Sequence, residues 1–272
     1  MKIGVRAHDF PKQSPESMAK EIRAAGFNAV QLALYKALDL RAEEMMRPDT
    51  LLMIRNAFES AGLEISVLGC YVDPGAVQSY DRQNSMDQFR QHVRIAKKLG
   101  AACVATETTA FSGTDTEREN AYGRILTFVR EMTKEAEDAG TFVAIEPVLA
   151  HTIHTPEMVR RLLLDVGSDR LRIIFDPINL LSPGDVEKQD DLWYRCMNCF
   201  GDKVIAMHVK NGCWEGSRYI PQPLDQGVMH FDPIFRWVKE KMPDLPLLRE
   251  EAVMCHVERD IVFLKAAFDH SA

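Results

Sequence analysis

The sequence has no long apolar run and no excess of positive charge. No apolar stretch approaches the ~20 residues that a membrane-spanning helix needs, and residues 1–6 lack the apolar core of a signal peptide. The net charge of -7 argues against a nucleic-acid partner, because phosphate backbones are bound by basic surfaces. We therefore expect a cytoplasmic protein that binds neither a membrane nor a nucleic acid.

Linkers, cysteine patterns and dinucleotide-binding motifs are also missing. Six cysteines are scattered over 272 residues, which favours reduced thiols over a disulfide framework. No segment rich in proline, glycine and serine divides the chain, so we expect one domain, residues 1–272. No G-x-G-x-x-G sequence follows a strand-like run, which disfavours a doubly wound dinucleotide-binding sheet.

What the chain does contain is a repeat marked by glycine. Gly26, Gly62, Gly100 and Gly140 each follow an amphipathic helical pattern and precede a short apolar run, as expected where a helix ends in a left-handed residue. Eight such units can be counted, which is typical of an α/β protein with the (β/α)₈ TIM-barrel fold. We expect strands near 2–6, 28–33, 64–69, 101–107, 141–146, 171–175, 203–209 and 245–250. We expect helices near 15–25, 48–61, 85–99, 116–139, 156–165, 188–200, 231–241 and 256–269.

The last four predicted strands each end in a residue that can bind a metal. These residues are Glu146, Asp176, His208 and Glu250. In a barrel of this kind the carboxyl ends of the strands meet at one mouth, where catalytic groups gather. Three carboxylates and an imidazole suit one divalent cation, such as Mn²⁺, Mg²⁺, Co²⁺ or Zn²⁺. Glu251 is a rival for the last position, but strand alternation lets only one of the pair point inward, and we prefer Glu250.

Three motifs carry a resemblance to a known family. They are Ile145-Glu146-Pro147, Phe175-Asp176-Pro177 and Met207-His208-Val209-Lys210. The chain resembles the xylose-isomerase-like TIM-barrel superfamily, and within it the sugar phosphate isomerase/epimerase branch, which includes ketose 3-epimerases and hydroxypyruvate isomerases. The resemblance implies that the four strand-end residues bind the metal. It also implies that Glu146 and Glu250 exchange protons on opposite faces of a substrate carbon.

The implied reaction is isomerisation or epimerisation of a ketose, sugar phosphate or small keto acid through an enediolate. An alternative is a dehydratase or lyase on the same scaffold, of the dehydroshikimate or inosose type, which starts from the same proton removal. A further alternative is an inactive sugar-binding barrel. The superfamily's AP endonucleases are disfavoured, because the extra histidine and aspartate ligands of their trinuclear zinc site are missing. The oligomeric state stays open, a homo-oligomer included.

Two positions depart from the family pattern. Asn179 stands where the family often has the histidine of Asp-x-x-His, and Asn211 replaces the aspartate of His-x-Lys-Asp. An amide can hydrogen-bond a sugar hydroxyl but cannot act as a base. We therefore predict both as substrate contacts. The other predicted substrate contacts are Lys210, Arg218, Glu107, His8 and Tyr71.

Two loops complete the predictions. Residues 210–230 form the longest loop-like stretch and are expected to cover the mouth of the barrel. The pair His151-x-x-His154 follows the fifth strand, and we expect it on a loop surface.

Overall fold

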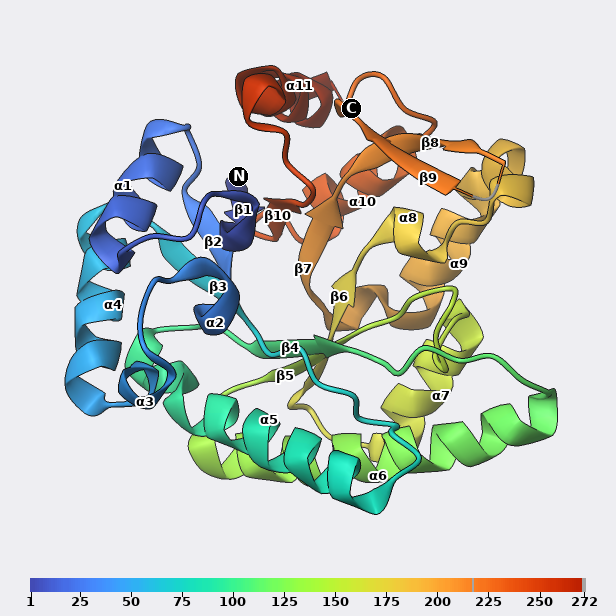
Figure 1. The fold of residues 1–272 in the computed structure, drawn as a ribbon. Coiled ribbons are helices and arrows are strands. Elements are labelled where there is room, and N and C mark those ends of the chain that lie inside the picture. Colours follow the sequence, from blue (N-terminus) through green and yellow to red (C-terminus); the bar gives the residue numbers. More distant parts are fainter. Residues whose placement is uncertain (217, 271–272) are drawn as a thin grey trace.

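Eight parallel strands close into a barrel that a ring of helices surrounds (Figure 1). The computed structural model describes residues 1–216 and 218–270. Around the barrel the strand order is β1-β10-β7-β6-β5-β4-β3-β2, and β1 closes the circle by pairing with both β2 and β10. The barrel strands are β1 (Lys2–Arg6), β2 (Ala29–Leu32), β3 (Glu64–Gly69), β4 (Val104–Glu107), β5 (Val143–Glu146), β6 (Leu171–Phe175), β7 (Val204–Val209) and β10 (Pro246–Arg249). This confirms the predicted (β/α)₈ TIM barrel.

Each barrel strand is followed by a helix, as the repeat predicted. The outer helices are α1 (Pro15–Ala24), α4 (Pro48–Ser60), α5 (Ser79–Leu99), α6 (Asp115–Ala139), α7 (Pro156–Val166), α9 (Gln189–Phe200), α10 (Asp232–Lys241) and α11 (Val257–His270). Short helices occupy the connections: α2 (Leu34–Ala37), α3 (Ala42–Met45), α8 (Pro177–Leu180), and the 3₁₀ turns η1 (Ala7–Asp9), η2 (Pro183–Lys188), η3 (Gly201–Lys203) and η4 (Met254–His256). Across the described residues, no helix is both long and apolar enough to cross a membrane.

The four glycines of the repeat have the backbone conformation that the sequence predicted. Gly26, Gly62, Gly100 and Gly140 have φ between +65° and +101°, a region that side-chain-bearing residues enter only at a cost. The chain therefore turns out of each helix and into the next strand at these points.

Two parts of the prediction were wrong. The stretch 210–230 is not simply a loop, because β8 (Asn211–Glu215) and β9 (Arg218–Gln222) pair in it as an antiparallel hairpin. Helix α5 begins at Ser79 and not near residue 85; its N-cap, Gln78, makes no side-chain capping bond. The start of this helix therefore lacks a capping side chain, and Asp81 in its first turn is the remaining sequence signal.

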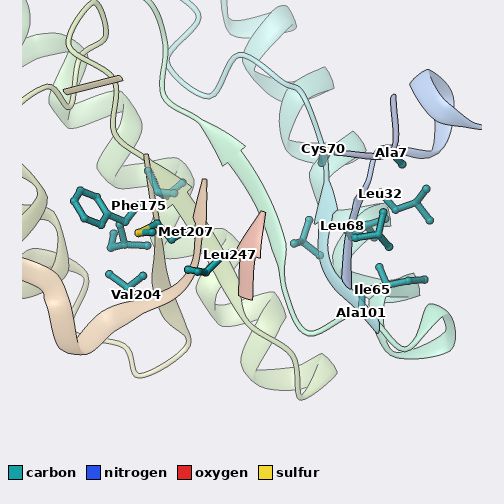
Figure 2. Packing of buried hydrophobic residues seen from close by; sticks show 14 of the residues in the cluster. Ala7, Leu32, Ile65, Leu68, Cys70, Ala101, Phe175, Val204, Met207 and Leu247 are labelled. Atoms are coloured by element: carbon teal, nitrogen blue, oxygen red, sulfur yellow. The ribbon is translucent and has the colours of Figure 1, made fainter. Parts of the chain in front are cut away.

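Apolar side chains form two separate layers, one on each side of the strands. The large outer layer lies between strands and helices, and Figure 2 shows members such as Phe175 and Met207 on one part of the barrel and Leu32 and Leu68 on another. The smaller inner layer fills the barrel itself with Ala29, Val67, Cys103, Ala105, Ala144, Ile174, Ala206 and Leu248. Gly4 belongs to the same crowded interior, since a Cβ there would lie 2.5 Å from Leu248 Cδ2.

Candidate active site

The polar side chains at the mouth stand two residues beyond the inner apolar layer. Side chains alternate along a strand, so a residue two positions after an inward-facing one also faces inward. Ala144, Ile174, Ala206 and Leu248 are inward-facing, and the residues two positions later are Glu146, Asp176, His208 and Glu250. Ala29 and Ala105 also face inward, and the residues two positions after them are Gln31 and Glu107. These two side chains are therefore expected to face inward as well.

Three of the four predicted ligands converge on one point. Each of Glu146, Asp176 and His208 offers a ligand atom, and these atoms lie within 4.8 Å of one another. His208 Nδ1 is 3.4 Å from Glu146 Oε1 and 3.4 Å from Asp176 Oδ2. All three side chains are buried, so water screens their charges little.

The orientation of His208 is fixed by a residue that the sequence analysis missed. Gln31 Oε1 lies 2.7 Å from His208 Nε2. Because a carbonyl oxygen only accepts, Nε2 is the protonated nitrogen, and Nδ1 faces the two carboxylates. Nδ1 has no hydrogen-bond partner among the described residues. A metal-binding histidine is commonly held in this way through its second nitrogen.

The cluster electrostatically favours a cation at Nδ1. Burial alone would lower the pKa of His208, but Glu146, Glu250 and Asp176 raise it well above its ordinary value. The carboxylates therefore favour positive charge at this nitrogen, as a proton or as a metal ion that replaces it. The donor set of one imidazole and two carboxylates fits a divalent cation.

Glu250 lies at the edge of this cluster and is held by two cations. Its Oε2 accepts from Lys210 Nζ at 2.6 Å, and its Oε1 accepts from Arg6 Nη1 at 2.9 Å. The distance from Glu250 Oε1 to His208 Nδ1 is 3.9 Å. Burial would raise the pKa of Glu250, but His208, Lys210 and Arg6 together lower it below its ordinary value. The carboxylate is therefore ionised at neutral pH.

Glu251 has a different geometry from Glu250. It leaves the strand with φ of +55°, in the left-handed region, and the next backbone N–H, of Ala252, donates to Asp9 Oδ2 at 2.9 Å. The chain therefore turns directly after Glu250, and only Glu250 continues the inward alternation of the strand.

Asn179 and Lys210, both predicted as substrate contacts, lie against the cluster. Asn179 Nδ2 donates to Glu146 Oε1 at 2.7 Å, and its backbone N–H donates to Asp176 Oδ1 at 3.2 Å. Lys210 Nζ is 3.1 Å from Asp176 Oδ2 and also bonds Glu250. Both residues therefore orient the carboxylates of the site.

Asn211 and Arg218, also predicted as substrate contacts, make no hydrogen bond or ion pair with the cluster among the described residues. The Asn211 amide is used within the chain: Nδ2 donates to Leu224 O at 2.7 Å, and Oδ1 accepts from the N–H groups of Gly212 and Met229. Asn211 thus holds the segment that follows β9 against the start of β8. Arg218 is exposed on β9.

The remaining predicted contacts line the other side of the mouth. Tyr71 Oη lies 3.4 Å from both Gln31 Nε2 and His8 Nε2. Glu107 Oε2 lies 3.7 Å from His151 Nε2. The loop-surface prediction for His151 was wrong, because its side chain is only 15% exposed and faces Glu107.

The sequence gives only a weak indication that Gln31 is a site residue. Gln31 is the single polar residue in the apolar run Ala29–Leu32.

Comparisons with known proteins identify the family of the chain. The model of the xylose isomerase-like TIM barrel family matches residues 19–250, so the chain belongs to this family. No curated protein matches it significantly by sequence.

Solved structures of the same fold share little sequence with the chain. A D-tagatose 3-epimerase-like protein superposes with a TM-score of 0.79 at 16% identity, over 99% of this chain and 97% of its own. A probable 3-DHS dehydratase from Bacillus anthracis gives 0.72 at 16%, over 97% and 99%. A xylose isomerase-like TIM barrel protein from Mycobacterium smegmatis, in complex with magnesium, gives 0.71 at 17%, over 100% and 98%. At these identities the likeness establishes the fold alone.

Proposed function

We propose that this chain is a divalent-metal-dependent isomerase or epimerase that acts on a ketose, a sugar phosphate or a small keto acid. The observation that carries the proposal is the buried cluster of Glu146, Asp176 and His208, in which Nδ1 of His208 faces two carboxylates without a hydrogen bond. Family membership and the magnesium complex of a protein with the same fold support it.

Glu146, Asp176 and His208 would hold the metal, with Glu250 beside them. When bound, the ion would polarise a substrate carbonyl and stabilise the negative charge of an enediolate. The protein's own residues supply the proton transfer. Glu250, kept ionised by Lys210 and Arg6, would accept a proton from the carbon next to the carbonyl.

Glu146 would return a proton on the other side of the substrate. Its carboxylate accepts a hydrogen bond from Asn179 Nδ2 at 2.7 Å, which fixes the orientation of the carboxylate. Burial raises the pKa of Glu146 in the metal-free protein. Lys210 would bind a substrate oxygen with the third N–H of its ammonium group, because Asp176 and Glu250 pair with the other two.

Metal binding tests the first part of the proposal. We expect the purified protein to retain a divalent cation, and Asp176→Ala and His208→Ala to lose it. The matched control is Glu251→Gln, which removes a neighbouring charge outside the cluster and should retain the metal. A protein that binds no divalent cation at any of several pH values would contradict the assignment.

Proton exchange tests the second part. A panel of ketoses incubated with the metal-loaded protein in D₂O should take up deuterium at the carbon next to the carbonyl, and Glu250→Gln should abolish the uptake. Accumulation of an unsaturated or deoxy product would instead identify a dehydratase. Sugar binding without exchange would identify a binding protein.

A further inference from the structure

One carboxylate, that of Asp9, joins the segments that follow the first and the last strand of the barrel. Asp9 ends the 3₁₀ turn η1, directly after β1, and its side chain is 6% exposed. Its Oδ1 accepts from Arg6 Nε at 2.8 Å, and its Oδ2 accepts from the backbone N–H of Ala252 at 2.9 Å. Because β1 pairs with β10 only up to Val5 and Arg249 (Figure 1), these bonds extend the connection beyond the paired strands.

The first consequence of these bonds concerns the guanidinium group of Arg6. Asp9 Oδ1 lies 2.8 Å from Nε and 2.7 Å from Nη2, so it occupies one edge of this planar group. The remaining nitrogen, Nη1, donates to Glu250 Oε1 at 2.9 Å. A guanidinium group presents its donors in a fixed fork, so an acceptor on one edge determines where the other donors point. Asp9 therefore directs Nη1 at Glu250.

The oxygen that Arg6 holds is the one that lies toward the metal cluster. Glu250 Oε1 is 3.9 Å from His208 Nδ1, whereas Oε2 is bound by Lys210 Nζ at 2.6 Å. Lys210 Nζ also lies 3.1 Å from Asp176 Oδ2, so this ammonium group is shared between two carboxylates. Arg6 therefore fixes the oxygen of Glu250 that Lys210 leaves free.

The second consequence concerns the backbone that follows Glu250. Within residues 1–216 and 218–270, Glu251 is the one residue other than glycine that has a positive φ, at +55°. A residue with a Cβ enters this region at a cost in free energy, so neighbouring contacts have to hold the turn. The next N–H, that of Ala252, donates to Asp9 Oδ2 and supplies such a contact. Asp9 therefore also stabilises the turn that leaves Glu250 as the last inward-facing residue of its strand.

We propose that Asp9 is a positioning residue for Glu250, acting on the carboxylate through Arg6 and on the backbone through the turn at Glu251. Both oxygens of Asp9 are used within the chain, so it orients the proton-accepting group and does not itself exchange a proton with the substrate. The consequence for turnover rests on the proposed function, in which Glu250 accepts the proton from the substrate carbon.

Turnover at saturating Mn²⁺ separates positioning from a purely structural role. The probe is the member of the ketose panel that takes up deuterium fastest with the wild-type protein. We expect Asp9→Ala to lower kcat for this exchange about 10- to 100-fold and to leave KM unchanged, because Glu250 acts in the chemical step. The matched control is Glu119→Ala, which removes an acid–arginine pair between α6 and α7 and should change neither constant. A loss of thermal stability with an unchanged kcat would overturn the proposal.

Two further variants test the separate bonds of Asp9. Glycine adopts positive φ without strain, so Glu251→Gly makes the turn independent of Asp9. We expect Asp9→Ala combined with Glu251→Gly to recover part of the lost kcat, since the contact with Arg6 stays broken. Asp9→Asn keeps the size of the side chain and one acceptor oxygen, and should lose less kcat than Asp9→Ala. A double variant with the kcat of Asp9→Ala would overturn the action through the turn.

A crystal structure of the Asp9→Ala variant tests the positioning without any turnover. We expect Glu251 to relax to negative φ and Glu250 Oε1 to move out of hydrogen-bond distance of Arg6 Nη1. Glu250 and Glu251 in unchanged positions would overturn the proposal. If the wild-type protein exchanges no ketose and the variant structure shows this movement, the proposed function fails and the positioning by Asp9 stands, so the two failures are distinguishable.

Discussion

At the scale of single residues, Gln31 orients a side chain of the cluster although it lies in a distant part of the sequence. It belongs to β2, whereas its partner His208 lies 177 positions later on β7. Its side-chain oxygen fixes which nitrogen of the imidazole carries the proton. The site therefore depends on a residue that would not itself touch the metal.

Replacing Gln31 by methionine should weaken metal binding. The variant keeps the length of the side chain but removes the acceptor for His208 Nε2, and loss of such a partner typically costs about 10- to 100-fold in affinity. Competition with a chromogenic chelator measures the change. Gln83→Met, at an exposed position on α5, is the control, and equal affinities for both variants would contradict the role of Gln31.

Some of the site residues could be predicted from sequence and others could not. Glu146, Asp176 and His208 each end an apolar run, so the pattern of the run locates them. Arg6 lies 244 positions from Glu250, and that contact exists only because the barrel closes β1 against β10. Local sequence patterns contain no information about which polar residues such closure brings together.

At the scale of secondary-structure elements, helix α6 contains one glycine in its interior and ends at another. Gly123 lies in the middle of the helix, exposed, and a Cβ there would meet nothing within 4 Å. Gly140 is the C-cap with φ of +65°. One glycine therefore weakens the helix, and the other is needed to end it.

Alanine substitutions at the two positions should have opposite effects on stability. Gly123→Ala should raise the free energy of unfolding by about 0.5–1 kcal/mol, because alanine restricts the unfolded chain and favours helix. Gly140→Ala should lower it by about 1 kcal/mol, because alanine is strained at positive φ. Urea unfolding at constant metal concentration measures the free energy of unfolding of both variants. Changes of the same sign would contradict the different backbone conformations assigned to Gly123 and Gly140.

The elements themselves were predictable where local signals exist. The N-caps Ser14 and Thr155 make the capping bonds that their sequences suggest. The hairpin of β8 and β9 was missed although its strands are separated in the sequence by Gly216-Ser217, a two-residue turn signal. The tertiary hydrogen bonds of Asn211 also fix its position, and Gly227 leaves space for that side chain, since a Cβ there would lie 1.9 Å from Asn211 Oδ1.

At the scale of the whole molecule, one buried ion pair connects three regions. Arg249 on β10 and Asp260 on α11 are each 1% exposed and 2.7 Å apart. Asp260 also accepts from Leu224 N–H at 2.8 Å, and Arg249 donates to Gln222 O at 3.3 Å. β10, α11 and the segment from Gln222 to Leu224 are therefore joined at one buried point.

Breaking this pair should destabilise the protein strongly. Asp260→Ala leaves the Arg249 charge buried without its partner, and we expect a loss of about 3–5 kcal/mol in the free energy of unfolding. Glu157→Ala removes the exposed pair with Arg195, whose side chains are 56% and 55% exposed, and should cost less than about 1 kcal/mol. Chemical denaturation measures the free energy of unfolding of the two variants. A similar loss for Asp260→Ala and Glu157→Ala would contradict the larger contribution that we assign to the buried pair.

The two-residue step from the inner apolar layer to the mouth has a consequence for insertions and deletions. Removing one residue within β6 would rotate Asp176 away from Glu146 and His208 and toward the surrounding helices, because each residue along a strand changes face. The same change a few residues later, beyond the strand end, would leave the proposed ligands in place and alter only the connecting loop. We therefore expect changes in length inside the strands to abolish the proposed metal binding and changes outside them to be tolerated. Loops of a different length could then alter substrate specificity while the cluster stays the same.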